Sequence, residues 1–152
     1  MADKLAVSIA SGLGIVALVI AVAWYFTERQ TMPLPEDSLI TKTKGIEETE
    51  FFLSQYPDAE VQVKRYPEDH AEVIYRVERP VNPPEELRHW PKTHSLSLWF
   101  EMTQSTGEIK DVYAECGSVA TDRATTDIIG YIVTTDCLNP NWDNVDYGQN
   151  EE

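Results

Sequence analysis

"HSLSLWFEM", residues 94–102, alternates polar and apolar side chains more regularly than any other stretch of this chain. Successive side chains of an extended strand point to opposite faces, so the apolar residues of this stretch share one face. They are Leu96, Leu98, Phe100 and Met102. The pattern predicts a strand with one buried face, which needs pairing strands beside it and a cover over its apolar side.

Three other segments supply the pairing strands. "EVQVKRY" (60–66) and "AEVIYRVER" (71–79) alternate with the same period, and "PEDH" between them predicts a hairpin. "TQSTG" then turns residues 94–102 into a fourth strand, "EIKDVYAEC" (108–116). Four antiparallel strands with one apolar face require helices over that face.

One helix is predicted over residues 46–56, "IEETEFFLSQY". Acidic side chains suit its first turn, and Pro57 ends it. Phe52, Leu53 and Tyr56 fall on one face of this helix at helical spacing. We expect that face to cover part of the sheet.

The segment 126–137, "TDIIGYIVTTDC", is ambiguous. Its β-branched residues favour a fifth strand, whereas Thr126 as N-cap and apolar residues at 128, 129, 132 and 133 favour a helix. A hairpin with 108–116 would hold Cys137 some 30 Å from Cys116 by strand rise. A disulfide needs Cα atoms within about 7 Å, so the two arrangements exclude each other. We favour the helix, and reduced, buried thiols remain the alternative to a disulfide.

Residues 5–26 carry no ionisable side chain except the phenol of Tyr25. As a helix this stretch would reach roughly 33 Å, enough to cross a hydrocarbon core of about 30 Å. Trp24 and Tyr25 then fall where interfacial aromatics anchor a spanning helix. Ala21-Val22-Ala23 resembles a signal-peptidase site, but the apolar run is longer than a secretory h-region. The sequence therefore predicts a retained transmembrane helix.

Small residues recur along this predicted helix. Ala2, Ala6, Ala10 and Gly14 follow one another every four residues, and Ser8 and Gly12 repeat the same spacing. Small side chains at this spacing let a second membrane helix approach closely. Alanine and glycine are also common in membrane helices in general. We interpret Ala6, Ser8, Ala10, Gly12 and Gly14 as a candidate helix-packing interface.

The expected organisation is α+β, with a single N-terminal transmembrane helix followed by a small antiparallel sheet of about four strands under one or two helices. Residues 1–4 form an N-terminal tail, 27–45 a proline-containing linker, 46–138 the domain and 139–152 an acidic tail.

The chain has 152 residues and a net charge of −14, all of it on residues 30–152. Such an acidic domain repels phosphate backbones, so nucleic-acid binding is not expected.

The two cysteines of the chain, Cys116 and Cys137, suit one disulfide in an oxidising compartment. Together with the export-like start they favour an N-terminus inside and a domain outside the cell membrane.

The proline-rich stretch "RPVNPPEELRHWPKTH" (79–94) is long for a loop of a compact domain. "PPEELRHW" within it can form a helical turn, and Trp90 is a candidate partner-contact residue. The alternative is that Trp90 packs back on its own domain.

His89 and His94 are the candidate metal ligands, since imidazole with the sulfur of Met102 or Cys116 suits copper. The proline between the two histidines disturbs helical spacing, and we predict no metal site, no cofactor and no catalytic residue. The common catalytic and phosphate-binding motifs are not present in the sequence.

"FLSQYPDAEVQV" (52–63), a β-meander, and "DIIGYIVTTDCL" (127–138) together resemble small exported or membrane-anchored proteins of archaea, especially ammonia oxidisers. In those proteins a helix ends in a "KYP"-like step and a late segment reads "I-x-x-Y-L…C". Here Gln55 replaces the lysine and Ile132 replaces the leucine. The resemblance implies an extracytoplasmic helix-plus-sheet domain and assigns no activity.

These observations predict a non-catalytic, single-pass accessory subunit of a membrane protein complex. The archaeal resemblance implies a monooxygenase or respiratory complex as the host. The expected partners are other membrane subunits, through the transmembrane helix, and the lipid bilayer. The alternative is a free-standing anchored extracytoplasmic module that binds a small ligand or a metal.

Overall fold

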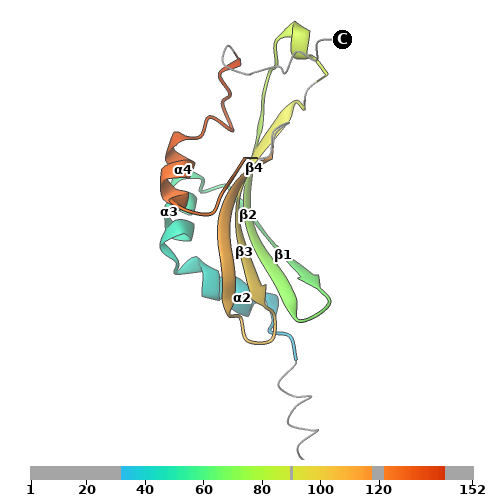
Figure 1. Ribbon diagram of the computed structural model, residues 1–152, viewed down its shortest axis with the longest axis vertical. Helices are drawn as coiled ribbons and strands as arrows, with labels where there is room; N and C mark the ends of the chain where they lie inside the picture. Colours follow the sequence, from blue (N-terminus) through green and yellow to red (C-terminus); the bar gives the residue numbers. More distant parts are fainter. Residues whose placement is uncertain (1–31, 90, 118–121, 143–152) are drawn as a thin grey trace, which may run out of the picture. The chain divides into compact units, whose positions relative to one another are not determined.

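The computed structural model describes residues 32–89, 91–117 and 122–142, which form an α+β domain (Figure 1). Within this part of the chain, five antiparallel strands make one sheet in the order β1-β2-β3-β4-β5. Three α-helices accompany the sheet. The predicted α+β class is confirmed, with one strand more than the expected four and three helices instead of the expected one or two.

The first hairpin is formed by β1 (Glu60–Tyr66) and β2 (His70–Pro80). Val63 pairs with Val73 in its middle, and Tyr66 pairs with His70 at the turn. Glu68 and Asp69 in the turn both have positive φ, at 64° and 60°. The strands expected at 60–66 and 71–79 are therefore confirmed.

The centre of the sheet is β3 (Thr93–Thr103), which pairs with β2 on one side and β4 (Ile109–Gly117) on the other. Its four predicted core residues are all fully buried, as their alternation requires. The pairing of β3 with β4 is interrupted by a bulge between Glu101 and Met102. Gly107 closes the hairpin with a φ of 67°, and a Cβ there would lie 2.4 Å from Cδ of Lys42.

The proline-rich stretch is the connection between β2 and β3. Pairing continues to Pro80 and Thr93, and the amide of Val81 still donates to the carbonyl of Lys92. A short 3-10 helix, η1 (Glu85–Leu87), follows, which confirms the expected helical turn in part. The long segment is thus a hairpin loop at the end of two long strands.

The additional strand is β5 (Asp122–Ala124), which pairs with β4 through Cys116 and Asp122 at one end and Ala114 and Ala124 at the other. Three residues, "DRA", are too short to show any alternation of polar and apolar side chains, so this strand has no detectable period. β5 forms the sheet edge opposite β1.

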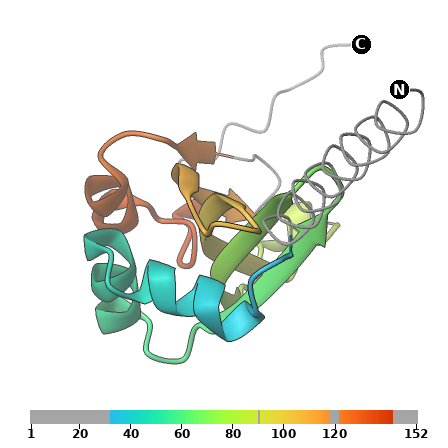
Figure 2. The ribbon, with the colours of Figure 1, turned by 90° about the horizontal axis from the view of Figure 1, so that it is seen from below.

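The helices gather on one side of the sheet (Figures 1 and 2). α3 (Glu47–Gln55) confirms the helix expected at 46–56. Its Phe52 is fully buried, and the rings of Phe52 and Tyr56 lie 5.1 Å apart. The predicted apolar face of this helix therefore does cover the sheet.

A second helix, α2 (Glu36–Lys44), lies where the linker 27–45 was expected, so that expectation is wrong for residues 36–44. Acidic residues begin this helix and lysines end it, which suits the helix dipole. Leu39 and Thr43, four residues apart, are fully buried. Only these two side chains supply the buried stripe, and the sequence therefore shows little amphipathic pattern.

The ambiguous segment is helical, as favoured: α4 spans Ile128–Thr134. The expected N-cap, Thr126, is wrong by one residue, because Asp127 adopts a left-handed conformation and its carboxylate accepts a hydrogen bond from the amide of Gly130. Ile128 and Ile132 are buried, whereas Val133 is 65 % exposed. The short helix turns only one narrow stripe towards the sheet.

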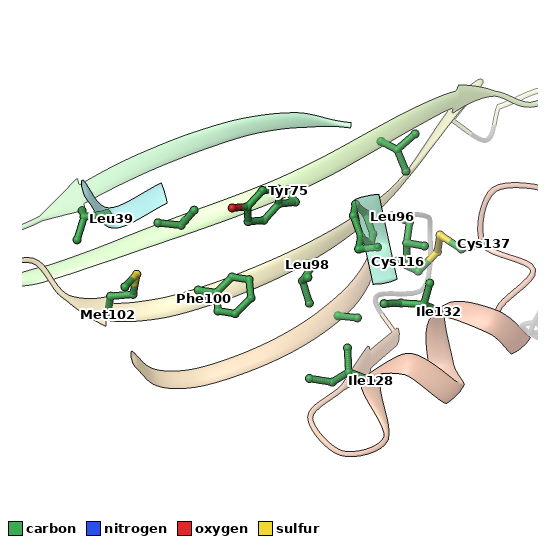
Figure 3. Packing of buried hydrophobic residues seen from close by; sticks show 14 of the residues in the cluster. Leu39, Tyr75, Leu96, Leu98, Phe100, Met102, Cys116, Ile128, Ile132 and Cys137 are labelled. Atoms are coloured by element: carbon green, nitrogen blue, oxygen red, sulfur yellow. A yellow bond between two sulfur atoms is a disulfide. The ribbon is translucent and has the colours of Figure 1, made fainter. Parts of the chain in front are cut away.

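Cys116 and Cys137 form a disulfide, with Cα atoms 5.7 Å apart. It ties the end of β4 to the segment after α4, next to Ile132 (Figure 3). The main core lies between the sheet and the three helices, and the disulfide closes one end of it.

No helix among residues 32–89, 91–117 and 122–142 is long and apolar enough to span a membrane. The predicted span 5–26 lies outside the described residues. So do the candidate packing residues Ala6, Ser8, Ala10, Gly12 and Gly14, and the candidate contact residue Trp90.

Candidate binding surface on the open face of the sheet

Among the described residues, the helices cover one face of the sheet, and we call the other face the open face (Figures 1 and 2). It carries the residues that alternate with the core positions. Among them are Lys64, Ile74, Arg76, Ser97, Trp99 and Tyr113.

Two aromatic rings occupy the middle of the open face. Trp99 and Tyr113 are cross-strand partners on β3 and β4, and their rings stack with centroids 5.7 Å apart and planes 8° from parallel. Ile74 pairs with Trp99 from β2 and is almost fully buried. The indole Nε1 of Trp99 is buried and has no hydrogen-bond partner within the described part of the chain. This face therefore has a small apolar centre of its own.

A cation covers each ring of this pair. Nζ of Lys64 lies 5.1 Å from the Trp99 ring, and Cζ of Arg123 lies 3.4 Å from the Tyr113 ring. Arg123 is also 3.2 Å from a carboxylate oxygen of Asp111. Burial raises the pKa of Tyr113 to about 12, against the opposing effect of Arg123. The aromatic centre is thus already covered by the chain's own cations.

A hollow of about 590 Å³ opens at the turn end of the open face. We call it the Glu72 notch, and it is lined by Tyr66, Pro67, Glu68, His70, Glu72 and Lys110. It gathers two carboxylates, an imidazole, a phenol and one ammonium group. Such a mixture of groups can bind a polar ligand.

Glu72 is the innermost charged group of the notch, with a side chain only 14 % exposed. Its Oε2 accepts a hydrogen bond of 2.8 Å from the hydroxyl of Tyr66. Its Oε1 lies 3.8 Å from Nε2 of His70, and the rings of Tyr66 and His70 are 5.3 Å apart. The hydrogen bond to Glu72 raises the pKa of Tyr66, so the phenol stays a donor.

The turn between β1 and β2 is fixed to the turn between β3 and β4. The carboxylate of Asp69 accepts hydrogen bonds from the amide and the hydroxyl of Ser105, at 2.8 and 2.5 Å. The carbonyl of Asp69 accepts a further bond from the amide of Gln104. These bonds hold the left-handed conformation of Glu68 and Asp69, which side-chain-bearing residues seldom adopt.

Lys110 reaches the notch because of the bulge in β4. Asp111 pairs with Glu101 and Ile109 pairs with Met102, which leaves Lys110 as the extra residue between them. Bulges redirect side chains and often lie beside functional sites. Two local irregularities, the strained turn and the bulge, therefore meet at the same hollow.

The candidate metal ligands lie in different surroundings. His94 is 3 % exposed at the start of β3, whereas His89 is exposed in the loop before it. Cys116 is held in the disulfide and so offers no thiolate. The described residues contain no group of three or more histidine, cysteine or acidic side chains placed to hold a metal ion.

The notch residues were not singled out from the sequence. The strand pattern does place Tyr66, His70 and Glu72 at outward positions around a tight turn, because they alternate with the apolar residues. The approach of Lys110 and Asp69 depends on a bulge and on a contact between two turns, and neither leaves a pattern in the sequence.

Comparison of the chain with protein-family models, with curated proteins and with solved structures finds no significant match.

Proposed function

We propose that this chain is a non-catalytic accessory subunit of a membrane protein complex, anchored by residues 5–26 and carrying its α+β domain outside the cell. The observation that carries the proposal is the Cys116–Cys137 disulfide on a chain with an apolar stretch of membrane-spanning length. Disulfides persist in oxidising compartments and are rare in the cytosol. The pair therefore supports an anchored domain on the outer side.

The lateral contact is assigned to the small residues of the predicted span. Ala6, Ala10 and Gly14 would let a partner helix approach closely, and van der Waals packing then stabilises the pair. The resemblance to archaeal proteins makes a membrane-bound monooxygenase or respiratory enzyme the first complex to search for.

The proposal is tested by mild detergent extraction of the full chain, native gel electrophoresis and mass spectrometry of the proteins that co-migrate. Ala10→Leu with Gly14→Leu should release the chain from its complex while it stays in the membrane. Ile15→Leu with Val19→Leu adds the same two leucines without enlarging a small residue, and should leave the complex intact. Migration of the unaltered chain without any partner would contradict the proposal.

The orientation has its own test. After mild reduction of intact cells, a membrane-impermeant maleimide should label Cys116 and Cys137 if the domain lies outside. Labelling that appears only after lysis would place the domain inside.

A second candidate function is a free-standing anchored module that binds a small ligand. The Glu72 notch favours it, because a hollow of about 590 Å³ can hold a small molecule. Such a module would keep both its ligand and its membrane location after Ala10→Leu with Gly14→Leu, and it would migrate alone on the native gel.

A further inference from the structure

We propose that the Glu72 notch binds the ammonium group of a lysine side chain presented by the partner subunit. This inference rests on the proposed function, since it names the chemistry by which the domain, as distinct from the membrane helix, contacts the complex.

The charge of the notch favours a cation. The lining residues carry one net negative charge, because the two carboxylates of Glu68 and Glu72 outnumber the single ammonium group of Lys110. The whole chain carries −14, so positive groups are attracted to the chain in general. Lys110 is exposed, whereas the carboxylate of Glu72 is largely shielded from water. A cation at Glu72 is therefore less screened than one at the rim.

The hydrogen bonding of Glu72 selects an ammonium over a guanidinium group. Oε2 already accepts a hydrogen bond from the hydroxyl of Tyr66. Oε1 lies 3.8 Å from Nε2 of His70, which is too far for a hydrogen bond. The carboxylate thus presents one oxygen to a ligand. A guanidinium fork gains its strength from two parallel bonds to both oxygens, whereas an ammonium acts as a point charge and needs one.

The wall of the notch suits the aliphatic stem of lysine. Tyr66 is 39 % exposed although it is a large aromatic residue, and its ring lies beside that of His70. An aromatic ring next to a carboxylate can contact the methylene groups of lysine and attract its ammonium through the ring face. Tyr66 thereby gains a cover that the described part of the chain does not provide.

The notch is preorganised for such a ligand. Asp69 and Ser105 hold the strained turn, and the bulge sets the position of β4 beside it. Backbone strain of this kind persists only where the surrounding structure fixes it, and it concentrates at ligand sites. Binding to a rigid hollow costs less conformational entropy than ordering a flexible loop.

The first test measures binding to the full chain in lipid nanodiscs by amide NMR shifts. The probe is Nα-acetyl-lysine methylamide, and the control probe is the same molecule with its Nζ acetylated. We expect saturable shifts at His70 and Glu72 with the first probe only. Glu72→Gln keeps an acceptor for Tyr66 but removes the charge, and should abolish them. Glu78→Gln makes the same change on the same strand and face, outside the notch, and should not.

Equal binding of the two probes, no saturable binding, or binding that survives Glu72→Gln would overturn the assignment.

The second test uses the complex itself. Glu72→Gln should weaken retention of the chain in the complex about tenfold or more, since bonds to charged groups are the stronger ones, while Glu78→Gln should not. If the unaltered chain co-migrates with partners and the two variants behave alike, the lysine assignment fails and the proposed function stands. If the unaltered chain binds the lysine probe yet migrates alone, the accessory-subunit proposal fails, and with it the partner as the source of the lysine.

Discussion

Nδ1 of His94 lies 2.9 Å from the carbonyl oxygen of Cys137, and this hydrogen bond joins the start of β3 to the segment that follows α4. A carbonyl oxygen only accepts, so Nδ1 carries the hydrogen. Nε2 is buried without a partner in the described residues, and the ring of Trp142 meets the imidazole edge-on at 5.9 Å. His94 therefore supports the same corner that the disulfide closes.

His94→Ala should lower the free energy of unfolding by about 2–4 kcal/mol. The change removes a buried ring and leaves the carbonyl of Cys137 without its donor. His89→Ala is the matched control: His89 is exposed, so its loss should stay within about 0.5 kcal/mol. Denaturant unfolding of the full chain in detergent, followed by tryptophan fluorescence, measures both. Equal effects of the two changes would show that the imidazole of His94 does not hold this corner.

The disulfide should contribute about 3 kcal/mol, because it closes a loop between residues 21 positions apart and so restricts the unfolded chain. Cys116→Ser with Cys137→Ser should lower the free energy of unfolding by that amount, and with it the denaturant midpoint. A reductant should lower the midpoint of the unaltered chain similarly and leave the double variant unchanged. A double variant that still responds to the reductant would contradict this origin of the effect.

The sheet could be predicted because burial leaves a period in the sequence. Leu96, Leu98, Phe100 and Met102 must all face the core, and a strand can satisfy that only by alternation. The distance that a disulfide allows between its Cα atoms then favoured a helix over a strand for residues 126–137. Long elements with one buried face were therefore recognisable.

The elements that were missed bury too little to leave such a period. α2 inserts only Leu39 and Thr43, and its remaining positions are free to be polar. β5 has three residues. The Glu72 notch depends on the contact of Asp69 with Ser105, 36 positions away, and a contact at that distance has no local signature.

Thr43→Val should destabilise the domain more than Tyr75→Phe. The hydroxyl of Thr43 lies 3.0 Å from the carbonyl of Ile40 and 2.8 Å from the hydroxyl of Tyr75. Because the carbonyl only accepts, Thr43 donates to Ile40 and accepts from Tyr75. Valine thus leaves a buried phenol without an acceptor, at about 1–3 kcal/mol, whereas Tyr75→Phe loses a net contribution of about 1 kcal/mol.

The double variant completes this comparison. Removing both hydroxyls should cost no more than Thr43→Val alone, since the orphaned phenol is then gone. Denaturant unfolding of the three variants measures the coupling. Strictly additive losses would show that the two hydroxyls do not depend on each other.

The free energy of unfolding depends on pH in the alkaline range because the phenol of Tyr113 ionises there. Burial raises the pKa of its phenol from 10.0 to about 12 in the folded chain. The unfolded chain releases this proton near pH 10, while the folded chain retains it, so unfolding is increasingly favoured between pH 10 and about 12. The stabilising contribution of the Tyr113 phenol is fully present below pH 10.

Tyr113→Phe cannot release a proton at this position and should therefore lose less stability between pH 10 and about 12 than the unaltered chain. Denaturant midpoints of the two proteins at pH 9, 10 and 11 measure the difference. If the midpoints of both proteins change with pH in parallel, the phenol of Tyr113 is not shielded from water as its stacking on the Trp99 ring implies.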